Sequence, residues 1–146
     1  MDRSSVRYER QTYAVMRGVT GFLFSCHGGQ KVFGLFDGSD APLFSLHGVA
    51  GLIELVCGLF MGIGFFTGCA AFLSSGLMAV AYFMVHFSKG FWPIQNRGEL
   101  AAVYCFVFLY MAVRGSGVWS LDSAFQKRKN STLITLNERR SVASEM

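Results

Sequence analysis

The stretch Leu46–Phe87 reads LHGVAGLIELVCGLFMGIGFFTGCAAFLSSGLMAVAYFMVHF and contains Glu54 as its only Asp, Glu, Lys or Arg residue. A bilayer core of about 30 Å is crossed by roughly 20 apolar residues in a helix. The stretch is therefore long enough for two membrane spans, which we place at Leu46–Phe66 and Thr67–Phe87. Because only the Thr-Gly pair at positions 67 and 68 separates them, we expect a very tight helical hairpin.

Two further apolar runs flank this hairpin, at Tyr13–Phe33 and Glu99–Arg114. Helix-breaking residues separate them from it, namely Gly38, Asp40 and Pro42 on one side and Pro93, Asn96 and Gly98 on the other. The pattern predicts an all-α, polytopic membrane protein with a four-helix transmembrane bundle at residues 13–122. Residues 1–12 and 123–146 are then cytoplasmic tails, and the polar, charged second tail is expected to be partly disordered.

The composition favours lipid over water as the main solvent. Of the 146 residues, 52% are hydrophobic and the mean hydropathy is +0.40, which is too apolar for a soluble domain of this size. The net charge of +4 comes mainly from the two tails, so we expect no nucleic-acid binding. The four cysteines form no CxxC pair and no zinc-type spacing, so they predict no metal site.

Basic residues next to the spans predict the orientation. They precede the first span and follow the last one, as Arg3, Arg7, Arg10, Arg114, Lys127, Arg128 and Lys129. Since cytoplasmic flanks are rich in Lys and Arg, both termini are expected in the cytoplasm. The opposite loops hold only Lys31, Lys89 and Arg97, with Asp37 and Asp40 beside them.

Arg17 lies about one turn inside the first span, and its long side chain is expected to reach back to the lipid headgroups. A lipoprotein-type signal sequence ending near Leu23–Cys26 is a weaker interpretation of this run, because Arg17 interrupts the apolar core that such a signal requires.

Ionisable residues inside or beside the spans gather in the non-cytoplasmic half, as His27, Lys31, His47, Glu54, His86 and Glu99. A charge at the bilayer centre costs on the order of 2.5 to 3.5 kcal/mol, so Glu54 needs a partner. Lys31 or His27 is the partner we expect, and Glu99 could share the same pocket. The plainer alternative is that Lys31 and Lys89 extend to the interface and that His47 is an interfacial residue.

His27 and His86 fall at one depth on different spans. Histidines so placed relay protons, contact a quinone carbonyl, or ligate a metal or haem. The metal and haem interpretations are the weaker ones, because nothing in the sequence fixes the geometry of a ligand set. Trp92 fits either an aromatic belt at the interface or the cap of a pocket.

Several stretches of this sequence share their order and spacing with one known family. They are Arg17-Gly18, His27-Gly28 with Lys31, Gly51-Leu52-Ile53-Glu54-Leu55 with Gly58, Met78 with Ala81 and His86, Phe91 with Pro93, Asn96 and Gly98-Glu99-Leu100, and finally Gly115-Ser116-Gly117 with Ser120-Leu121-Asp122. From about Arg17 to Asp122 the chain resembles the DoxX family of small bacterial membrane proteins. The resemblance implies a four-helix fold in the bacterial inner membrane and a relation to subunits of thiosulfate:quinone oxidoreductase and terminal quinol oxidase systems.

Together, the resemblance and the outer polar cluster imply a quinone-linked redox subunit. His27 and Glu54 would exchange protons with a quinone headgroup, and Lys31 would stabilise negative charge on its ring oxygen, so these three are the candidate catalytic residues. The candidate binding-pocket residues are His86, Asn96, Glu99 and Trp92. No flavin, nicotinamide or iron–sulfur motif occurs in the sequence, so electrons would be exchanged with a partner protein or a small reduced substrate.

Two other functional classes stay open. A non-enzymatic membrane protein that assists assembly of other complexes, or that binds a lipid-like ligand, needs no electron carrier, and the polar cluster would then fix the register of the helices. A proton-coupled transporter is the weaker alternative, because four short spans need a homo-oligomer to provide room for alternating access.

Overall fold

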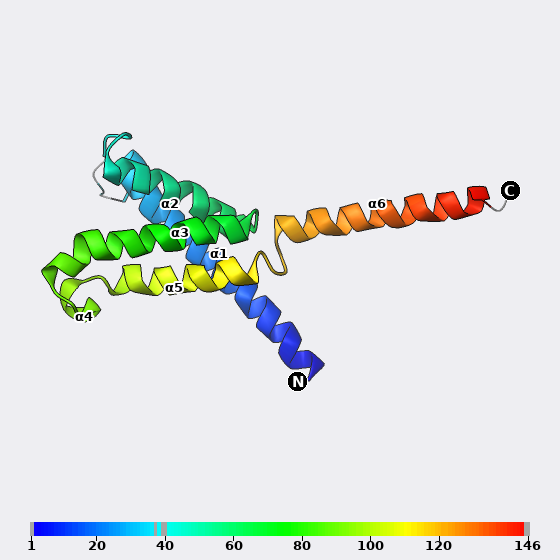
Figure 1. Ribbon diagram of the computed structural model, residues 1–146, viewed down its shortest axis with the longest axis horizontal. Helices are drawn as coiled ribbons and strands as arrows, with labels where there is room; N and C mark the ends of the chain where they lie inside the picture. The colour runs from blue at the N-terminus through cyan, green and yellow to red at the C-terminus, as the bar shows by residue number, and fades with distance from the viewer. Residues whose placement is uncertain (1, 37, 39–40, 145–146) are drawn as a thin grey trace.

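The computed structural model describes residues 2–36, 38 and 41–144, and every regular element in this part of the chain is a helix (Figure 1). The bundle consists of α1 (Arg3–Phe33), α2 (Leu46–Ile63), α3 (Thr67–Ala81) and α5 (Glu99–Arg114). Between α3 and α5 the chain forms a π-helical turn η1 (Tyr82–His86), a 3-10 turn η2 (Phe87–Lys89) and the short α4 (Pro93–Asn96). The last helix, α6 (Leu121–Ser144), projects away from the bundle.

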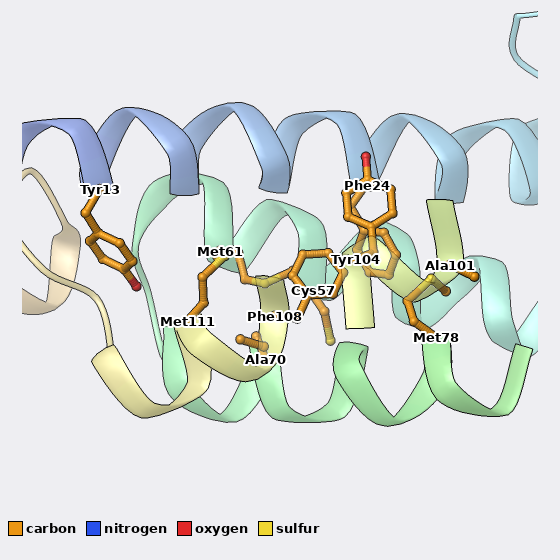
Figure 2. Close-up of a cluster of buried hydrophobic side chains, with 11 residues drawn as sticks. Tyr13, Phe24, Cys57, Met61, Ala70, Met78, Ala101, Tyr104, Phe108 and Met111 are labelled. Carbon is orange, nitrogen blue, oxygen red and sulfur yellow. The ribbon is translucent and has the colours of Figure 1, made fainter. Parts of the chain in front are cut away.

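The bundle is built from two helix pairs. Helix α1 packs along α2, α3 packs along α5, and α2 joins the pairs through α3. The buried side chains between them form one core, with Tyr13, Phe24, Cys57, Met61, Ala70, Ala71, Met78, Ala101, Tyr104, Phe108 and Met111 as members. Figure 2 shows this core running along the bundle from Tyr13 near one end to Met78 and Ala101 near the other.

The helical hairpin predicted from the apolar stretch is confirmed. Among the described residues, Leu46–Ile63 and Thr67–Lys89 are the helical segments long and apolar enough to cross a membrane. Gly64 ends α2 in the left-handed conformation, with φ of 74°, and the N–H of Phe65 donates to the carbonyl of Phe60 over 2.9 Å. This helix-ending motif reverses the chain within three residues. Glycine suits the position because it adopts the left-handed conformation without strain.

Helices α1 and α2 approach closely enough to exclude a side chain at Gly28. A Cβ atom there would lie 2.2 Å from the backbone nitrogen of Leu55 and 2.6 Å from the carbonyl oxygen of Gly51. Small residues at such crossings let helix backbones pack directly on each other, which is how helices associate in lipid.

We expect Gly28→Ala to lower the free energy of unfolding by about 2 kcal/mol, because overpacking forces the two backbones apart. Thermal or detergent-denaturant unfolding of the purified protein measures this change. Gly18→Ala is the matched control on the same helix, because nothing lies within 4 Å of a Cβ atom at Gly18. If the two variants unfold alike, close backbone contact does not hold α1 against α2.

Three segments converge at one end of the bundle, which we call the closed end: residues 9–17 of α1, the α2–α3 turn at 61–66, and residues 114–122. The Tyr13 hydroxyl donates to the carbonyl of Gly115, and Arg114 forms an ion pair with Glu9 over 2.7 Å. The N–H of Asp122 donates to the carbonyl of Gly64 over 3.1 Å, so the start of α6 is tied to the hairpin turn.

The expectation that Arg17 reaches back to the headgroups is wrong. Arg17 is only 2% exposed, and its guanidinium donates to the carbonyls of Met61 and Trp119, each over 2.8 Å. The reason is that the last turn of a helix leaves carbonyl groups without intrahelical partners. The carbonyl of Met61, which also accepts from the N–H of Gly64, lies at the end of α2 beside Arg17. Nη1 and Nη2 are therefore bonded without reaching water, whereas Nε is buried without a partner among the described residues.

The segment after residue 122, expected to be partly disordered, is helical as α6 up to Ser144. Its start is capped by Ser120, whose hydroxyl oxygen accepts from the N–H of Ser123 over 3.1 Å. A serine cap satisfies one of the free N–H groups of the first turn. The boundary expected at residue 12 is likewise not a break in the backbone, because α1 is continuous from Arg3.

Candidate functional site

A cavity of about 230 Å³ lies at the end of the bundle opposite the closed end. Its apolar wall is made by Phe24, Met78, Ala81, Leu100 and Ala101, and its polar wall by His27, Lys31, Glu54, His86, Arg97 and Tyr104. These side chains come from α1, α2, α3, η1, the end of α4 and α5. The bundle thus brings together polar residues that are far apart in the sequence.

Lys31 and Glu54 form an ion pair in this cavity, as expected from their depth. The ammonium nitrogen of Lys31 donates to Glu54 Oε1 over 2.6 Å. Glu54 is 2% exposed, whereas the Lys31 side chain is 25% exposed and lies nearer the mouth. The second carboxylate oxygen, Oε2, is buried and accepts no hydrogen bond from any described residue. Oε2 is therefore an unpartnered buried acceptor on a residue that lines the cavity.

His27 and Tyr104 face each other across α1 and α5. Their rings meet edge to face, with 6.4 Å between centroids. The Tyr104 ring also stacks on Phe108, with 5.2 Å between centroids and 9° between planes. This packing fixes the ring, while its hydroxyl forms no hydrogen bond within residues 2–36, 38 and 41–144. Tyr104 thus offers a rigid donor or acceptor to the cavity.

His86 is the last residue of the π-helical turn η1, and its Nδ1 lies 3.1 Å from the carbonyl oxygen of Asn96. A carbonyl oxygen only accepts, so Nδ1 carries a proton and the Nε2 of the neutral ring keeps its lone pair. Isolated π turns inside helices are frequent at functional sites. Here the turn places His86 on the cavity wall.

Asn96 supports His86 from behind and does not line the cavity. It is 1% exposed, its amide donates to the carbonyl of Gly90 over 2.8 Å, and its side-chain oxygen accepts from the N–H of Gly98 over 2.8 Å. These bonds hold the loop between η2 and α5, so the Asn96 carbonyl that orients His86 is itself fixed.

Of the residues predicted for the site, His27, Lys31, Glu54 and His86 line the cavity, whereas Trp92 and Glu99 do not. Trp92 is 60% exposed, and Glu99 is exposed without an ion pair to any described residue. His47 is exposed at the start of α2. Asp37 and Asp40, expected beside the basic loop residues, lie outside the described residues.

Arg97 and Tyr104 also line the cavity, although neither was predicted as a site residue. A signal for Tyr104 was present, because it shares the period of Ala101, Phe108 and Met111, which are the buried positions of α5. A phenol on the buried face of an apolar helix needs a polar partner or a polar ligand. Within the described part of the chain, no three His, Cys, Asp or Glu side chains converge as they would around a metal ion.

This chain is similar to a known protein family and to one bacterial protein. The DoxX family model matches residues 13–87. A Haemophilus influenzae protein, described as an uncharacterized protein, is 38% identical over 129 residues, which covers 84% of this chain and 96% of the relative. No solved structure gives a significant match. The region matched by the family model includes His27, Lys31, Glu54 and His86 of the cavity wall.

Proposed function

Because this chain belongs to the DoxX family of membrane proteins, we propose that it is a multi-pass protein of the bacterial inner membrane that binds a quinone headgroup in the cavity opposite its closed end. In this proposal it is a redox subunit that exchanges electrons with a partner protein. The apolar surface, the distribution of charge and the chemistry of the cavity wall each support one part of the proposal.

Four crossings by α1, α2, α3 with η1, and α5 are supported by the large apolar side chains that each helix exposes. Phe22, Leu52, Phe72 and Phe106 are each between 48% and 71% exposed, as expected for side chains that face lipid. The charges inside α1 do not oppose its crossing, because Arg17 and Lys31 both have partners. The 16 residues of α5 give a length of about 24 Å, a mismatch that a locally thinner bilayer accommodates.

Cytoplasmic termini are supported by the basic residues around the closed end. Arg7 precedes it and Arg10 lies within it on α1, and Lys127, Arg128 and Lys129 follow it on α6. Positive charge collects on the cytoplasmic side of membrane proteins. The cavity then lies in the outer, periplasmic half of the bilayer.

The observation that carries the quinone proposal is the buried, unpartnered Glu54 Oε2 beside the Lys31 ion pair. Leaving such a buried acceptor unpaired costs about 1–3 kcal/mol, and a quinol hydroxyl would remove that cost by donating to it. Lys31 and Tyr104 supply donors for the oxygens of the oxidised ring, so the wall suits both redox forms. Phe24 and Met78 provide apolar surface for the ring.

Proton exchange follows from the same geometry. Oxidation of a quinol to a quinone would send two electrons to the partner protein and release two protons, one to Glu54 and the other to His27. Lys31 would stabilise the negative charge that develops on the ring oxygen. His27 and the free Nε2 of His86 would carry protons between the cavity and the outer aqueous phase.

The test is binding of decylubiquinol and decylubiquinone to the detergent-purified full chain, together with mass-spectrometric and optical analysis for co-purified quinone. We expect Glu54→Gln to weaken quinol binding about tenfold, because a hydrogen bond to a charged acceptor contributes about 1.5–3 kcal/mol. Glu99→Gln is the matched control, since Glu99 is exposed and does not line the cavity. His27→Ala should also weaken binding.

A ligand-free wild-type protein, with Glu54→Gln and His27→Ala variants that lose only thermal stability, would contradict the quinone proposal. That result would favour a structural polar cluster in a protein that assists assembly of other membrane complexes.

A further inference from the structure

Two adjoining recesses lie at the closed end, where the first turns of α1 meet the loop between α5 and α6. One, of about 240 Å³, is lined by Val6, Arg7, Arg10, Gln11, Val118 and Trp119. The other, of about 210 Å³, is lined by Arg10, Tyr13, Arg114, Gly117 and Val118. Because they share Arg10 and Val118, we treat them as one surface and call it the basic recess.

The basic recess has two arginines whose charges are not compensated. Arg114 is paired with Glu9 over 2.7 Å and lies 4.8 Å from the centroid of the Tyr13 ring. Arg7 and Arg10 are exposed and form no hydrogen bond or ion pair with any described residue. Three positions apart, they lie on one face of α1, so both guanidinium groups can reach one anion.

We propose that the basic recess binds the phosphate of an anionic phospholipid in the cytoplasmic leaflet. The planar donors of a guanidinium match phosphate oxygens in pairs, which makes Arg the preferred residue for such contacts. Basic pockets between membrane helices on the cytoplasmic side bind anionic headgroups in this way. This inference depends on the proposed membrane orientation and not on the ligand of the distant cavity.

The apolar part of the recess favours a lipid over a free phosphate ion. Trp119 is 65% exposed, and Val6 and Val118 line the recess beside the two arginines. Tryptophan belongs at the level of the headgroups, where one side of its ring meets acyl chains and the other meets water. The glycerol and upper acyl chains of a lipid would cover these side chains, whereas a phosphate ion would leave them exposed.

The experiment is native mass spectrometry of the full chain in detergent, titrated with palmitoyl-oleoyl phosphatidylglycerol or phosphatidylcholine. We expect wild type to bind the first phosphatidylglycerol in preference to phosphatidylcholine. Arg7→Gln/Arg10→Gln should weaken phosphatidylglycerol binding about thirtyfold, since each of the two basic residues near anionic lipid contributes about 1 kcal/mol. Arg7→Lys/Arg10→Lys should retain most of the affinity.

Lys127→Gln/Lys129→Gln is the matched control, because it removes the same charge from α6 outside the recess. An equal loss of phosphatidylglycerol affinity in both glutamine variants would indicate diffuse electrostatic attraction and not a specific site. Displacement of phosphatidylglycerol by excess inorganic phosphate would make it a site for free phosphate. Either result, or no preference for phosphatidylglycerol in wild type, overturns the inference. Unfolding temperatures check that the variants are folded, and quinol titration of the same samples shows separately whether the cavity proposal holds.

Discussion

Replacing Lys31 with methionine is expected to lower the free energy of unfolding by about 3 kcal/mol. The change leaves the Glu54 carboxylate, which is 2% exposed, without the ammonium group that lies 2.6 Å from it. Removing one partner of a buried ion pair is costly because the remaining charge stays buried and uncompensated. The measurement is denaturant or thermal unfolding in one detergent, with the wild type alongside.

The double variant Lys31→Met/Glu54→Leu separates a structural role from a ligand-binding role. Apolar replacement of both partners removes the buried charge, so the double variant should recover most of the lost stability. A double variant no more stable than Lys31→Met would show that the two side chains do not stabilise the fold as a pair. A stable double variant that no longer binds quinol would indicate that the ion pair serves ligand binding and is not needed for stability.

The helices could be predicted because an apolar run of about 20 residues has the length of a membrane-spanning helix. The predicted span Glu99–Arg114 and helix α5 have the same bounds, and the predicted span Thr67–Phe87 became α3 with the turns η1 and part of η2. Depth along a helix also follows from residue number, at 1.5 Å per residue. That is why the sequence predicts Lys31 or His27 as the partner of Glu54, and the structure shows that the partner is Lys31.

Depth does not say which way a side chain faces. Glu99 begins α5 at the depth of the cavity, yet it is exposed on another face of the helix. Trp92 follows the last turns after α3 at the same end and is also exposed. Facing depends on how each helix is rotated against its neighbours, and that rotation is decided by the packing of the whole core.

Arg17 could not be placed from the sequence for a different reason. Its acceptors belong to Met61, Gly62 and Trp119, which are 44, 45 and 102 positions away along the chain. A local pattern of one basic residue near a helix end fits both a headgroup contact and a buried contact. Only the meeting of three chain segments at the closed end decides between them.

Arg17→Met is therefore expected to lower the free energy of unfolding by about 4 kcal/mol, since hydrogen bonds to charged groups contribute about 1.5–3 kcal/mol each. The substitution leaves the carbonyl of Trp119 without its donor and loosens the loop before α6 from the hairpin turn. Unfolding measures the loss, and faster proteolysis between Gly115 and Ser120 would report the freed loop.

Two controls decide whether the guanidinium itself stabilises the closed end. Arg17→Lys keeps the charge, but a lysine ammonium lacks the planar fork with which the guanidinium reaches carbonyls on two segments. It should therefore recover only part of the lost stability. Arg10→Met removes an exposed arginine from the same helix and should stay within about 0.5 kcal/mol of wild type in lipid-free detergent. If Arg17→Met is as stable as Arg10→Met, the buried contacts contribute little and the headgroup position first expected for Arg17 regains support.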